Sequence, residues 1–492
     1  MLIGEKAAAI GNSISLTNWE GSATGSVSGN STTTHTITTN IPAKKIVVVS
    51  LDSTALSDPS GVRINLLDSS GRAVTKNVSW HPYTCMTFFK TTASTQQYRV
   101  QIVSNMTFSY GIKVAVVNAM EFVPCDCLGY AETEYADSTY MISDSPESLS
   151  GACRAEDGKF LARGRLKGKC RLYWEHYNNL GSTMKFGVLL WNTGSTTIYV
   201  SLTSRSVKDG PTSYEAASLG VWVDCLNDVK QADLSELPTN GVLAIPGGEK
   251  KWVALSTVPC AGSNHTGFFN GQLTLNITTT ASASGPRYTG NALLCDTYIM
   301  GTGYDSQVKA RTGNMVAALE SGQLRGSGTG ALLYSSIPEL PVAAGNPYDI
   351  VITGTDIPNL QNGEKISLKT YSPSGAATTL TDNCFNYGVM YRFVIGKITC
   401  NTSNRVTVKL LMNAKTNPNC AVDRWAGVYA IGTITTASGN QVFSKLLYCS
   451  ADSSQDRNEY VISTQVPTNQ QVILNVVISG MSSMPPEISF CV

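Results

Sequence analysis

Short stretches of alternating or β-branched apolar residues recur along the chain at intervals of about ten residues, a spacing typical of β-sandwiches. Turn sequences such as Asp68-Ser-Ser-Gly71 separate them. The pattern predicts an N-terminal arm over residues 1–19 and a first β-sandwich over residues 20–123. The strands expected in this sandwich are residues 45–51, 62–67, 85–89, 98–103 and 112–117.

The same pattern continues through the rest of the chain and predicts two further sandwiches. An acidic segment containing Cys and Tyr, residues 124–152, has no firm periodicity and indicates a linker. Residues 153–335 are expected to form the second sandwich, with insertions, and residues 336–492 the third, after a boundary rich in Gly and Pro. The one helix candidate is residues 313–320. We therefore expect an all-β chain of about three immunoglobulin-like or jelly-roll-like sandwiches in tandem.

The strands expected in the second sandwich are residues 185–191, 197–202, 220–224, 252–255, 272–277 and 292–299. Those expected in the third are residues 348–352, 365–369, 391–395, 405–411, 428–431, 442–447 and 472–478.

Charge is sparse and balanced, because only 14% of the 492 residues are charged and the formal net charge is +1. A chain with so small a net charge has no overall field that attracts nucleic acid, so we expect no specific nucleic-acid partner. No run of 18 or more apolar residues is present, and we expect no membrane span. The first residues lack the basic and apolar regions of a signal peptide.

Five basic residues alternate with small or apolar residues between positions 163 and 171. On a β-strand, this alternation places all five cations on one face, about 6.6 Å apart. Three interpretations stay open: an edge strand protected by its charges, a contact with acidic residues of the same or another subunit, and a site for a polyanion. The row is Arg163, Arg165, Lys167, Lys169 and Arg171, and the candidate acidic counterpart is Glu132, Glu134 and Asp137.

Thirteen dispersed cysteines are many for a reducing compartment and favour disulfides in an oxidising one. The odd number leaves at least one thiol that is free or bonded to another subunit. The candidates for an intermolecular disulfide are Cys125, Cys127 and Cys491. For Cys125 and Cys127 we favour the alternative that each pairs with a distant cysteine of its own chain, whereas Cys491 can equally reach another chain or tie down the last strand.

No constellation typical of catalysis or of metal binding stands out. Only four histidines are present, none follows a G-x-S-x-G elbow, and Cys125-x-Cys127 has no second pair to complete a zinc site. The run Gly326-x-Gly328-x-Gly330 lacks the Lys of a phosphate loop. We therefore expect no catalytic residue, no metal and no cofactor, and the chain is not expected to be an enzyme.

Two turn sequences carry a resemblance to a known family. These are Trp191-Asn-Thr-Gly-Ser195 and Ile245-Pro-Gly-Gly-Glu249, the second lying just before Lys251-Trp-Val. Residues 185–257 resemble the bacterial extracellular immunoglobulin-like domains of the CARDB-like kind, with an insertion near residues 205–240. The resemblance implies a β-sandwich that acts as a surface binding or spacer module and has no catalytic residues.

These observations predict a non-enzymatic structural surface protein. We expect a homo-oligomer or polymer, most simply a self-assembling subunit of an extracellular filament, appendage or surface layer at a cell or spore surface. In this hypothesis the apolar arm, residues 1–16, adds a strand to a neighbouring copy. The alternatives are a phage structural or receptor-binding protein and an adhesin that binds a host or a surface polysaccharide. The adhesin's aromatic platform would be Tyr173, Trp174, Trp222 and Trp252.

Overall fold

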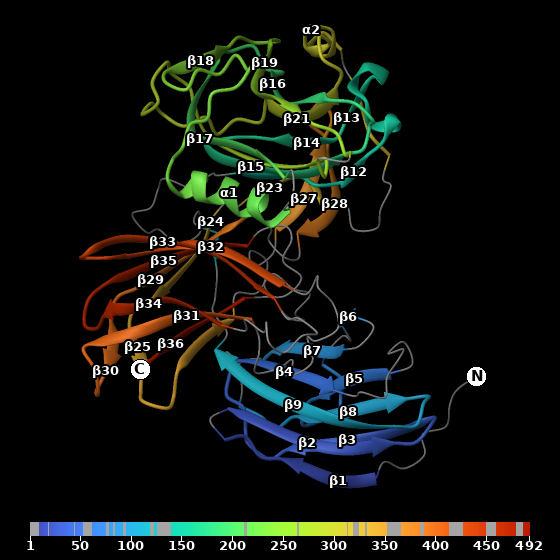
Figure 1. Ribbon diagram of the computed structural model, residues 1–492, viewed down its shortest axis with the longest axis vertical. Coiled ribbons are helices and arrows are strands. Elements are labelled where there is room, and N and C mark those ends of the chain that lie inside the picture. Colours follow the sequence, from blue (N-terminus) through green and yellow to red (C-terminus); the bar gives the residue numbers. More distant parts are fainter. Residues whose placement is uncertain are drawn as a thin grey trace.

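The computed structural model confirms an all-β chain, in which the described residues include two α-helices, α1 and α2, and two 3-10 turns at Gly151–Cys153 and Ala155–Asp157 (Figure 1). The structure describes residues 9–17, 19–43, 45–52, 62–74, 78–81, 84–91, 95–118, 123–124, 139–210, 214–262, 265–311, 313–317, 324–329, 332–351, 366–383, 388–412, 427–448, 459–478 and 486–492.

The first sandwich packs a four-stranded sheet, in the order β1-β3-β8-β5, against strands β2, β9, β4, β7 and β6. Its core lies between these two layers and is built from alternating residues such as Val47 and Val49 of β4 and Val100 and Ile102 of β8. The strands are β1 (Ala9–Ile14), β2 (Glu20–Val27), β3 (Ser31–Ile37), β4 (Lys45–Asp52), β5 (Val62–Leu67), β6 (Val78–His81), β7 (Thr84–Lys90), β8 (Arg99–Ser104) and β9 (Phe108–Asn118). All five strands expected here are confirmed.

The N-terminal arm is not separate from the first sandwich. Residues 9–14 form β1, which pairs in parallel with β3 at the edge of the four-stranded sheet. Ile14 is fully buried in the core, and its carbonyl accepts a hydrogen bond from the amide of Thr38 at 2.9 Å. The prediction of a detached arm is therefore wrong for residues 9–14, because this segment pairs with β3 of its own sandwich and Ile14 is buried in the core.

The middle sandwich packs the sheet β18-β17-β20-β15-β11-β23-β27-β28 against the sheet β14-β21-β16-β19. Its strands are β11 (Thr139–Ser143), β12 (Ser148–Leu149), β13 (Lys159–Phe160), β14 (Ala162–Arg165), β15 (Lys169–Asn178), β16 (Met184–Asn192), β17 (Ile198–Asp209), β18 (Val242–Ile245), β19 (Lys250–Val258), β20 (Phe268–Thr278), β21 (Leu293–Met300), β22 (Asn314–Met315), β23 (Arg325–Thr329), β27 (Ile366–Tyr371) and β28 (Ala377–Asn383). The short helix α2 (Asp305–Lys309) and the β13–β22 pair lie at its outer face.

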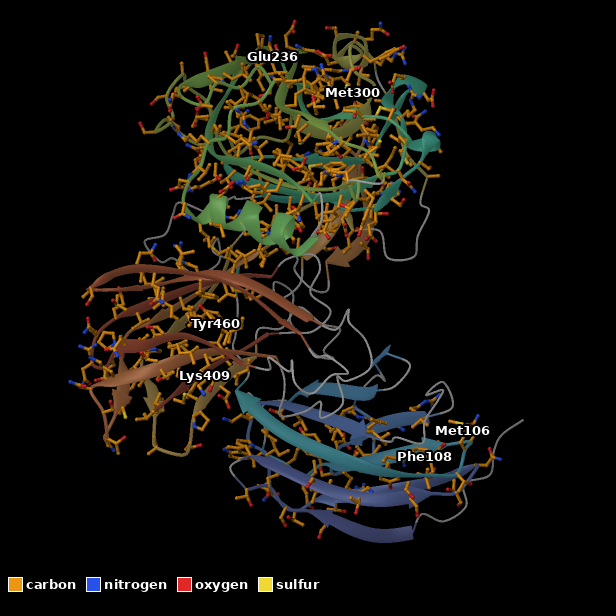
Figure 2. The ribbon with its side chains drawn as sticks, viewed as in Figure 1. Met106, Phe108, Glu236, Met300, Lys409 and Tyr460 are labelled. Atoms are coloured by element: carbon orange, nitrogen blue, oxygen red, sulfur yellow. The ribbon has the colours of Figure 1, made fainter. Side chains whose placement is uncertain are left out.

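The third sandwich packs the sheet β10-β24-β29-β35-β32-β33 against strands β34, β31, β36 and β26. Its strands are β10 (Val123–Pro124), β24 (Leu332–Ile337), β26 (Tyr348–Val351), β29 (Met390–Ile395), β31 (Arg405–Met412), β32 (Gly427–Thr436), β33 (Gly439–Tyr448), β34 (Glu459–Pro467), β35 (Val472–Ile478) and β36 (Pro486–Cys491), with a small pair of β25 (Leu340–Val342) and β30 (Ile398–Cys400). Lys409 of β31 and Tyr460 of β34 mark one layer of it in Figure 2.

The three sandwiches are not divided along the chain at the predicted boundaries. Residues 139–143 and 148–149 of the expected linker are strands of the middle sandwich. Strands β27 and β28, within the expected third domain, extend the large sheet of the middle sandwich through β23. Tandem division is therefore wrong for these segments, because sheet pairing joins strands that are far apart in sequence.

The helix α1 (Tyr214–Leu226) lies between the middle and third sandwiches (Figure 1). Val221 and Trp222 have no exposed surface and belong to the same core as Tyr173 of β15 and Tyr391 of β29. This helix occupies the insertion expected near residues 205–240, but residues 220–224 were expected to be a strand, and that prediction is wrong. The helix predicted at 313–320 is also wrong where it is described, since Asn314 and Met315 form β22.

The two turn sequences that carry the family resemblance lie against each other. They connect β16 to β17 and β18 to β19, so both cross between the two sheets of the middle sandwich. The Asn192 side-chain amide donates to the carbonyls of Thr196 and Ile245, both at 2.8 Å. The amide of Gly248 donates to the carbonyl of Asn192 at 2.8 Å. The motif thus has a structural role of its own, and the family resemblance itself stays a prediction.

Candidate functional site

The predicted basic row is divided between the two sheets of the middle sandwich. Strand β14 ends at Arg165 and β15 begins at Lys169, and each belongs to a different sheet. Gly168 makes the turn between them with φ of +58°, a conformation that glycine adopts without steric cost. The prediction of five cations on one face of one strand is therefore wrong.

Arg163 is buried and forms a bidentate ion pair with Asp296 on the neighbouring strand β21. Its Nε and Nη2 lie 2.5 and 2.6 Å from the two carboxylate oxygens, and Tyr298 donates to the same carboxylate at 3.1 Å. Burial opposes the charge of Arg163, but the hydrogen bond and charge of Asp296 outweigh it, so the pKa of Arg163 is raised. Arg163 thus pairs with an acidic residue of its own chain, although not with the predicted acidic segment.

Arg165 and Arg171 also contact other parts of the chain. Arg165 donates to the carbonyl of Gly375 at 2.8 Å and lies 4.2 Å from the ring centre of Tyr371, so it joins β14 to the β27–β28 hairpin. Arg171 is buried and lies 5.9 Å from the ring centre of Trp222 in α1. Lys167 and Lys169 are half-buried. The five cations therefore do not form one exposed surface, and a polyanion role for the partly exposed members stays a prediction.

The predicted acidic counterpart and two of the candidate cysteines lie outside the described residues. These are Glu132, Glu134, Asp137, Cys125 and Cys127.

Cys491 is described and is half-buried at the end of β36. This strand lies between β31 and β26, so the C-terminal segment is held inside a sheet on both sides. An intermolecular disulfide at Cys491 stays a prediction.

Six other cysteines are free thiols, in contrast to the disulfides expected from their number. Burial raises the pKa of Cys170 and of Cys295, as it does for a thiol that cannot be solvated as a thiolate. Thiols of this kind behave as small apolar core residues. The six are Cys153, Cys170, Cys225, Cys260, Cys295 and Cys400, of which Cys260 and Cys400 are only half-buried.

The four aromatic residues expected to form an adhesin platform are all in protein cores. Their exposed fractions are 1% for Tyr173, 1% for Trp174, 0% for Trp222 and 4% for Trp252. A platform must present the face of its rings to a ligand, so this prediction is wrong. Large aromatic side chains pack into a core when another layer covers them. Here α1 covers Tyr173, and the ring centres of Tyr173 and Trp222 lie 5.1 Å apart.

A buried Ser–His contact was not predicted from the sequence. The hydroxyl of Ser143 lies 3.0 Å from Nε2 of His176 and 2.8 Å from the hydroxyl of Thr297, while Nδ1 of His176 lies 2.9 Å from the carbonyl of Pro146. His176 has no exposed surface, and burial lowers its pKa to about 4. A nucleophile and base of an enzyme must reach a substrate, so this geometry fits a satisfied core histidine.

A second buried polar cluster lies on β15 and β20. Tyr173 donates a hydrogen bond to Glu175, and the side-chain amide of Asn270 donates to both, at 2.9 and 3.1 Å. Burial raises the pKa of Glu175 to about 7, with a hydrogen bond from Tyr173 opposing the rise and the charge of Glu147 adding to it. The sequence signal for this cluster is the alternation of polar side chains inside strands that are otherwise apolar.

The edge of the middle sandwich at β19 is already hydrogen-bonded by a loop, residues 233–237. The carboxylates of Asp233 and Glu236 accept the amides of Leu255 and Trp252 at 2.8 and 2.9 Å. The amides of residues 234 and 236 donate to carbonyls of the same strand at 3.0 Å. Arg205, 2% exposed, holds this loop through an ion pair with Asp233 at 2.9 Å. Figure 2 shows Glu236 at the end of the sandwich opposite α1.

The third sandwich has two edge strands that are not covered in this way. Strands β33 and β34 are the last strands of its two sheets, and no strand of the described ranges pairs with their outer sides. The side-chain amide of Gln441 donates to the carbonyl of Ile462 at 2.8 Å, which links the two edges. Val442 and Val461 are 38% and 39% exposed. We call β33 and β34 together the edge surface, and it is the candidate functional site.

Charge does little to protect the edge surface from pairing with another strand. In ten residues β33 carries one charged side chain, Lys445, and in nine residues β34 carries one, Glu459. Natural proteins usually protect such edges with several charges, a proline or a covering segment. A long, weakly charged edge is therefore a template for strand pairing.

Among the described residues, no helix has both the length and the apolar character that crossing a membrane requires. No protein-family model matches the sequence, and no curated protein matches it.

Several solved structures share a slight likeness with the chain. A periplasmic inhibitor of g-type lysozyme from Aeromonas hydrophila is 13% identical, with a TM-score of 0.17, over 21% of this chain and 96% of that one. A tandem CBM22 domain of Paenibacillus barcinonensis Xyn10C is 11% identical, with a TM-score of 0.15, over 55% and 82%. The CUB1-EGF-CUB2 domain of human MASP-1/3 is 9% identical, with a TM-score of 0.14, over 57% and 100%. These likenesses carry no functional argument.

Proposed function

We propose that this chain is a non-enzymatic structural subunit that assembles with copies of itself through the edge surface of the third sandwich. The proposed product is a filament, appendage or layer at a surface outside the cell. The observation that supports it is the exposed β33–β34 edge, which differs from the loop-covered edge at β19.

Strand pairing would supply both the energy and the register of the contact. In a ten-residue edge such as β33, about five residues point their backbone outward, and each offers one N–H and one C=O to a partner strand. Each hydrogen bond contributes about 0.5–1.5 kcal/mol net, and burying Val442 and Val461 adds an apolar term. These terms together are of the size of the association cost of about 4–15 kcal/mol. Pairing is therefore sensitive to single substitutions at the edge.

The low net charge supports the same proposal. Copies that each carry a net charge of +1 repel one another little, so close packing of many copies has a small electrostatic cost. The resemblance of residues 185–257 to extracellular immunoglobulin-like domains supports a place at a surface. Disulfides are no part of the proposal.

The test is to place a charge on the edge surface and, as a matched control, on the covered edge. Val442→Lys adds an ammonium group to β33, whereas Leu234→Lys adds one to the loop over β19, where Leu234 is 60% exposed. We expect regular polymers of the wild-type chain and of Leu234→Lys by electron microscopy and sedimentation velocity, and monomers of Val442→Lys. A wild-type chain that stays monomeric at high concentration, or a Val442→Lys variant that polymerises normally, overturns the proposal.

A further inference from the structure

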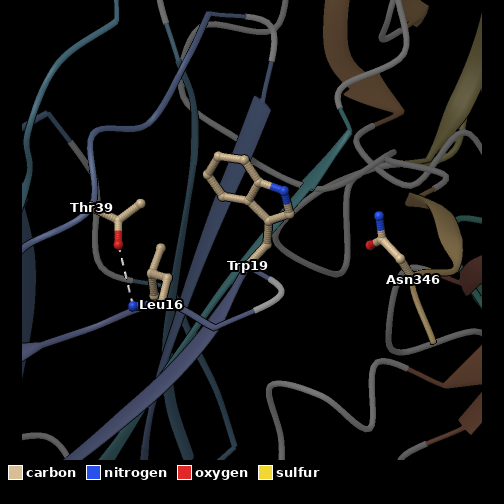
Figure 3. Close-up of a pocket in the computed structure, with 4 residues that line it drawn as sticks. All are labelled: Leu16, Trp19, Thr39 and Asn346. Carbon is tan, nitrogen blue, oxygen red and sulfur yellow. Dashed lines mark hydrogen bonds between the residues drawn. The ribbon is translucent and has the colours of Figure 1, made fainter.

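The groups around the hollow in Figure 3 already contact their own chain. The amide of Leu16 donates to the hydroxyl of Thr39 at 3.3 Å. The ammonium group of Lys45 lies 5.6 Å from the ring centre of Trp19. Another hollow, of about 350 Å³, lies at the start of β18 in the middle sandwich, and its lining includes Asn240 and Gly241.

These two residues form an Asn-Gly pair in the bend that precedes β18. Both are exposed, so water reaches them. Within the described part of the chain, neither the side chain of Asn240 nor the backbone amide of Gly241 has a hydrogen-bond partner. Gly241 has φ of +105°, which glycine adopts without strain, and it has no Cβ to hinder the approach of its nitrogen to the Asn240 side chain. The two groups that react in an Asn-Gly pair are therefore both free.

A second Asn-Gly pair of the same chain is held rigidly. Asn270 has no exposed surface, and its side-chain amide donates to the Tyr173 hydroxyl and the Glu175 carboxylate at 2.9 and 3.1 Å. Gly271 lies inside β20 and is paired with a strand on each side. The rotation that brings the two reacting groups together would break these contacts. A third pair, residues 362–363, lies outside the described residues.

We propose that Asn240 deamidates spontaneously in the folded chain, and that Asn270 is protected. Asparagine is a chemically labile residue. In this reaction the backbone nitrogen of Gly241 attacks Cγ of Asn240 and loses its proton to water, while the side-chain nitrogen takes up a proton and leaves as ammonia. Water then opens the resulting five-membered succinimide ring at one of its two carbonyl carbons. The products are aspartate and isoaspartate, and nothing is oxidised or reduced.

The modification changes both the charge and the backbone at this end of the large sheet. Each conversion adds one carboxylate to the hollow that Asp228 and Lys230 also line, and it takes the formal net charge from +1 to 0. Isoaspartate has one more methylene group in the main chain, directly before the first pair of β18, Val242 with Ser201. The site is separate from the edge surface, and the inference does not rest on the proposed function.

The experiment ages the full folded chain in mildly alkaline buffer below its unfolding temperature and follows its tryptic peptides by mass spectrometry. Residues 231–250 and 252–287 form separate peptides with one Asn-Gly pair each, and fragmentation assigns the converted residue. We expect aspartate and isoaspartate to accumulate at Asn240. Asn270 reacts only in molecules in which β20 has opened, so we expect its conversion to be at least about tenfold slower.

The control is the same chain aged in denaturant, where neither pair is held and both are expected to convert. Asn240→Gln is the matched variant, because glutamine keeps the amide but has to close a larger ring, so we expect it to stay unconverted. An Asn240 that keeps its amide in the folded chain, over the time in which the unfolded chain converts it, overturns the proposal. Equal rates at Asn240 and Asn270 in the folded chain, or conversion of Asn240→Gln at the wild-type rate, overturn it as well.

Discussion

The middle and third sandwiches have the same architecture but differ in whether their edge strands are covered and in how their charged side chains are paired. In the middle sandwich a loop bonds the amides of β19, and buried charges such as Arg163 and Arg205 are paired inside the chain. In the third sandwich β33 and β34 end their sheets with half-exposed valines. The middle sandwich thus covers its β19 edge and pairs these charges within its own chain, whereas the edge surface of the third is where we propose that copies meet. Substitutions of the buried polar groups in the middle sandwich are expected to lower stability, whereas those on the edge surface are expected to change assembly and to leave stability nearly unchanged.

The largest effect on stability is expected from the buried ion pair of the middle sandwich. Arg163→Met leaves Asp296 as an unpaired buried charge, which costs about 3–5 kcal/mol of the free energy of unfolding. Arg405→Met in the third sandwich removes an exposed guanidinium that contacts Gln465, and we expect a change within about 0.5 kcal/mol. Denaturant unfolding followed by tryptophan fluorescence measures both.

Replacing both members of the pair distinguishes the cost of an unpaired buried charge from the cost of changing the shape of the side chains. Arg163→Met combined with Asp296→Leu removes the uncompensated carboxylate, so we expect it to recover much of the lost stability. Equal stabilities of Arg163→Met and the wild-type chain contradict a buried pair.

The next effect concerns the pH dependence of the middle sandwich. Glu175 has a folded pKa of about 7 against an ordinary value of 4.5, so its proton stabilises the fold and this stability is lost as pH rises from about 4.5 to 7. His176 has a folded pKa of about 4 against 6.5, so stability is lost as pH falls from about 6.5 to 4. The two contributions oppose each other over most of this range.

Glu175→Gln removes only the first of these contributions. Relative to the wild-type chain, its free energy of unfolding is expected to rise by about 3 kcal/mol between pH 4.5 and 7, since 2.5 pKa units correspond to about that energy. Chemical unfolding of both proteins at a series of pH values gives the difference. A difference that does not change with pH contradicts a raised pKa for Glu175.

A smaller effect is expected at the paired turns of the middle sandwich. Asn192→Ala removes the donor for the carbonyls of Thr196 and Ile245, and we expect a loss of about 2 kcal/mol. Asn440→Ala, at the exposed start of β33 in the third sandwich, where the side chain of Asn440 accepts from Thr435, is expected to change stability by less than about 0.5 kcal/mol. Thermal unfolding compares the two variants directly, and equal losses would remove the contrast between the regions.

The strands were largely predictable from the sequence, because alternation of side chains reports which face of a strand is buried. The helix α1 was not predictable, because the apolar residues around Val221 and Trp222 have the pattern of a short strand. The helix also packs between two sandwiches, so it has no polar face that would reveal a helical period. The divided basic row shows another limit, because one turn at Gly168 moves half of a regular pattern into another sheet.

Long-range pairing was the hardest part to predict. Arg163 and Asp296 are 133 residues apart, and nothing local in the sequence connects them. The edge surface depends on which strand ends each sheet, and that order follows from the whole topology rather than from β33 itself. Composition did indicate a weakly charged chain with no catalytic pattern, which is why assembly was the leading prediction.

Backbone hydrogen exchange of the assembled and the monomeric chain tests the central claim most directly, because it reports which amides acquire new partners. Assembly is expected to slow exchange in residues 439–448 and 459–467, whereas residues 250–258, already bonded by the loop over β19, exchange alike in both states. Protection that appears elsewhere and leaves β33 and β34 unchanged contradicts assembly through the edge surface.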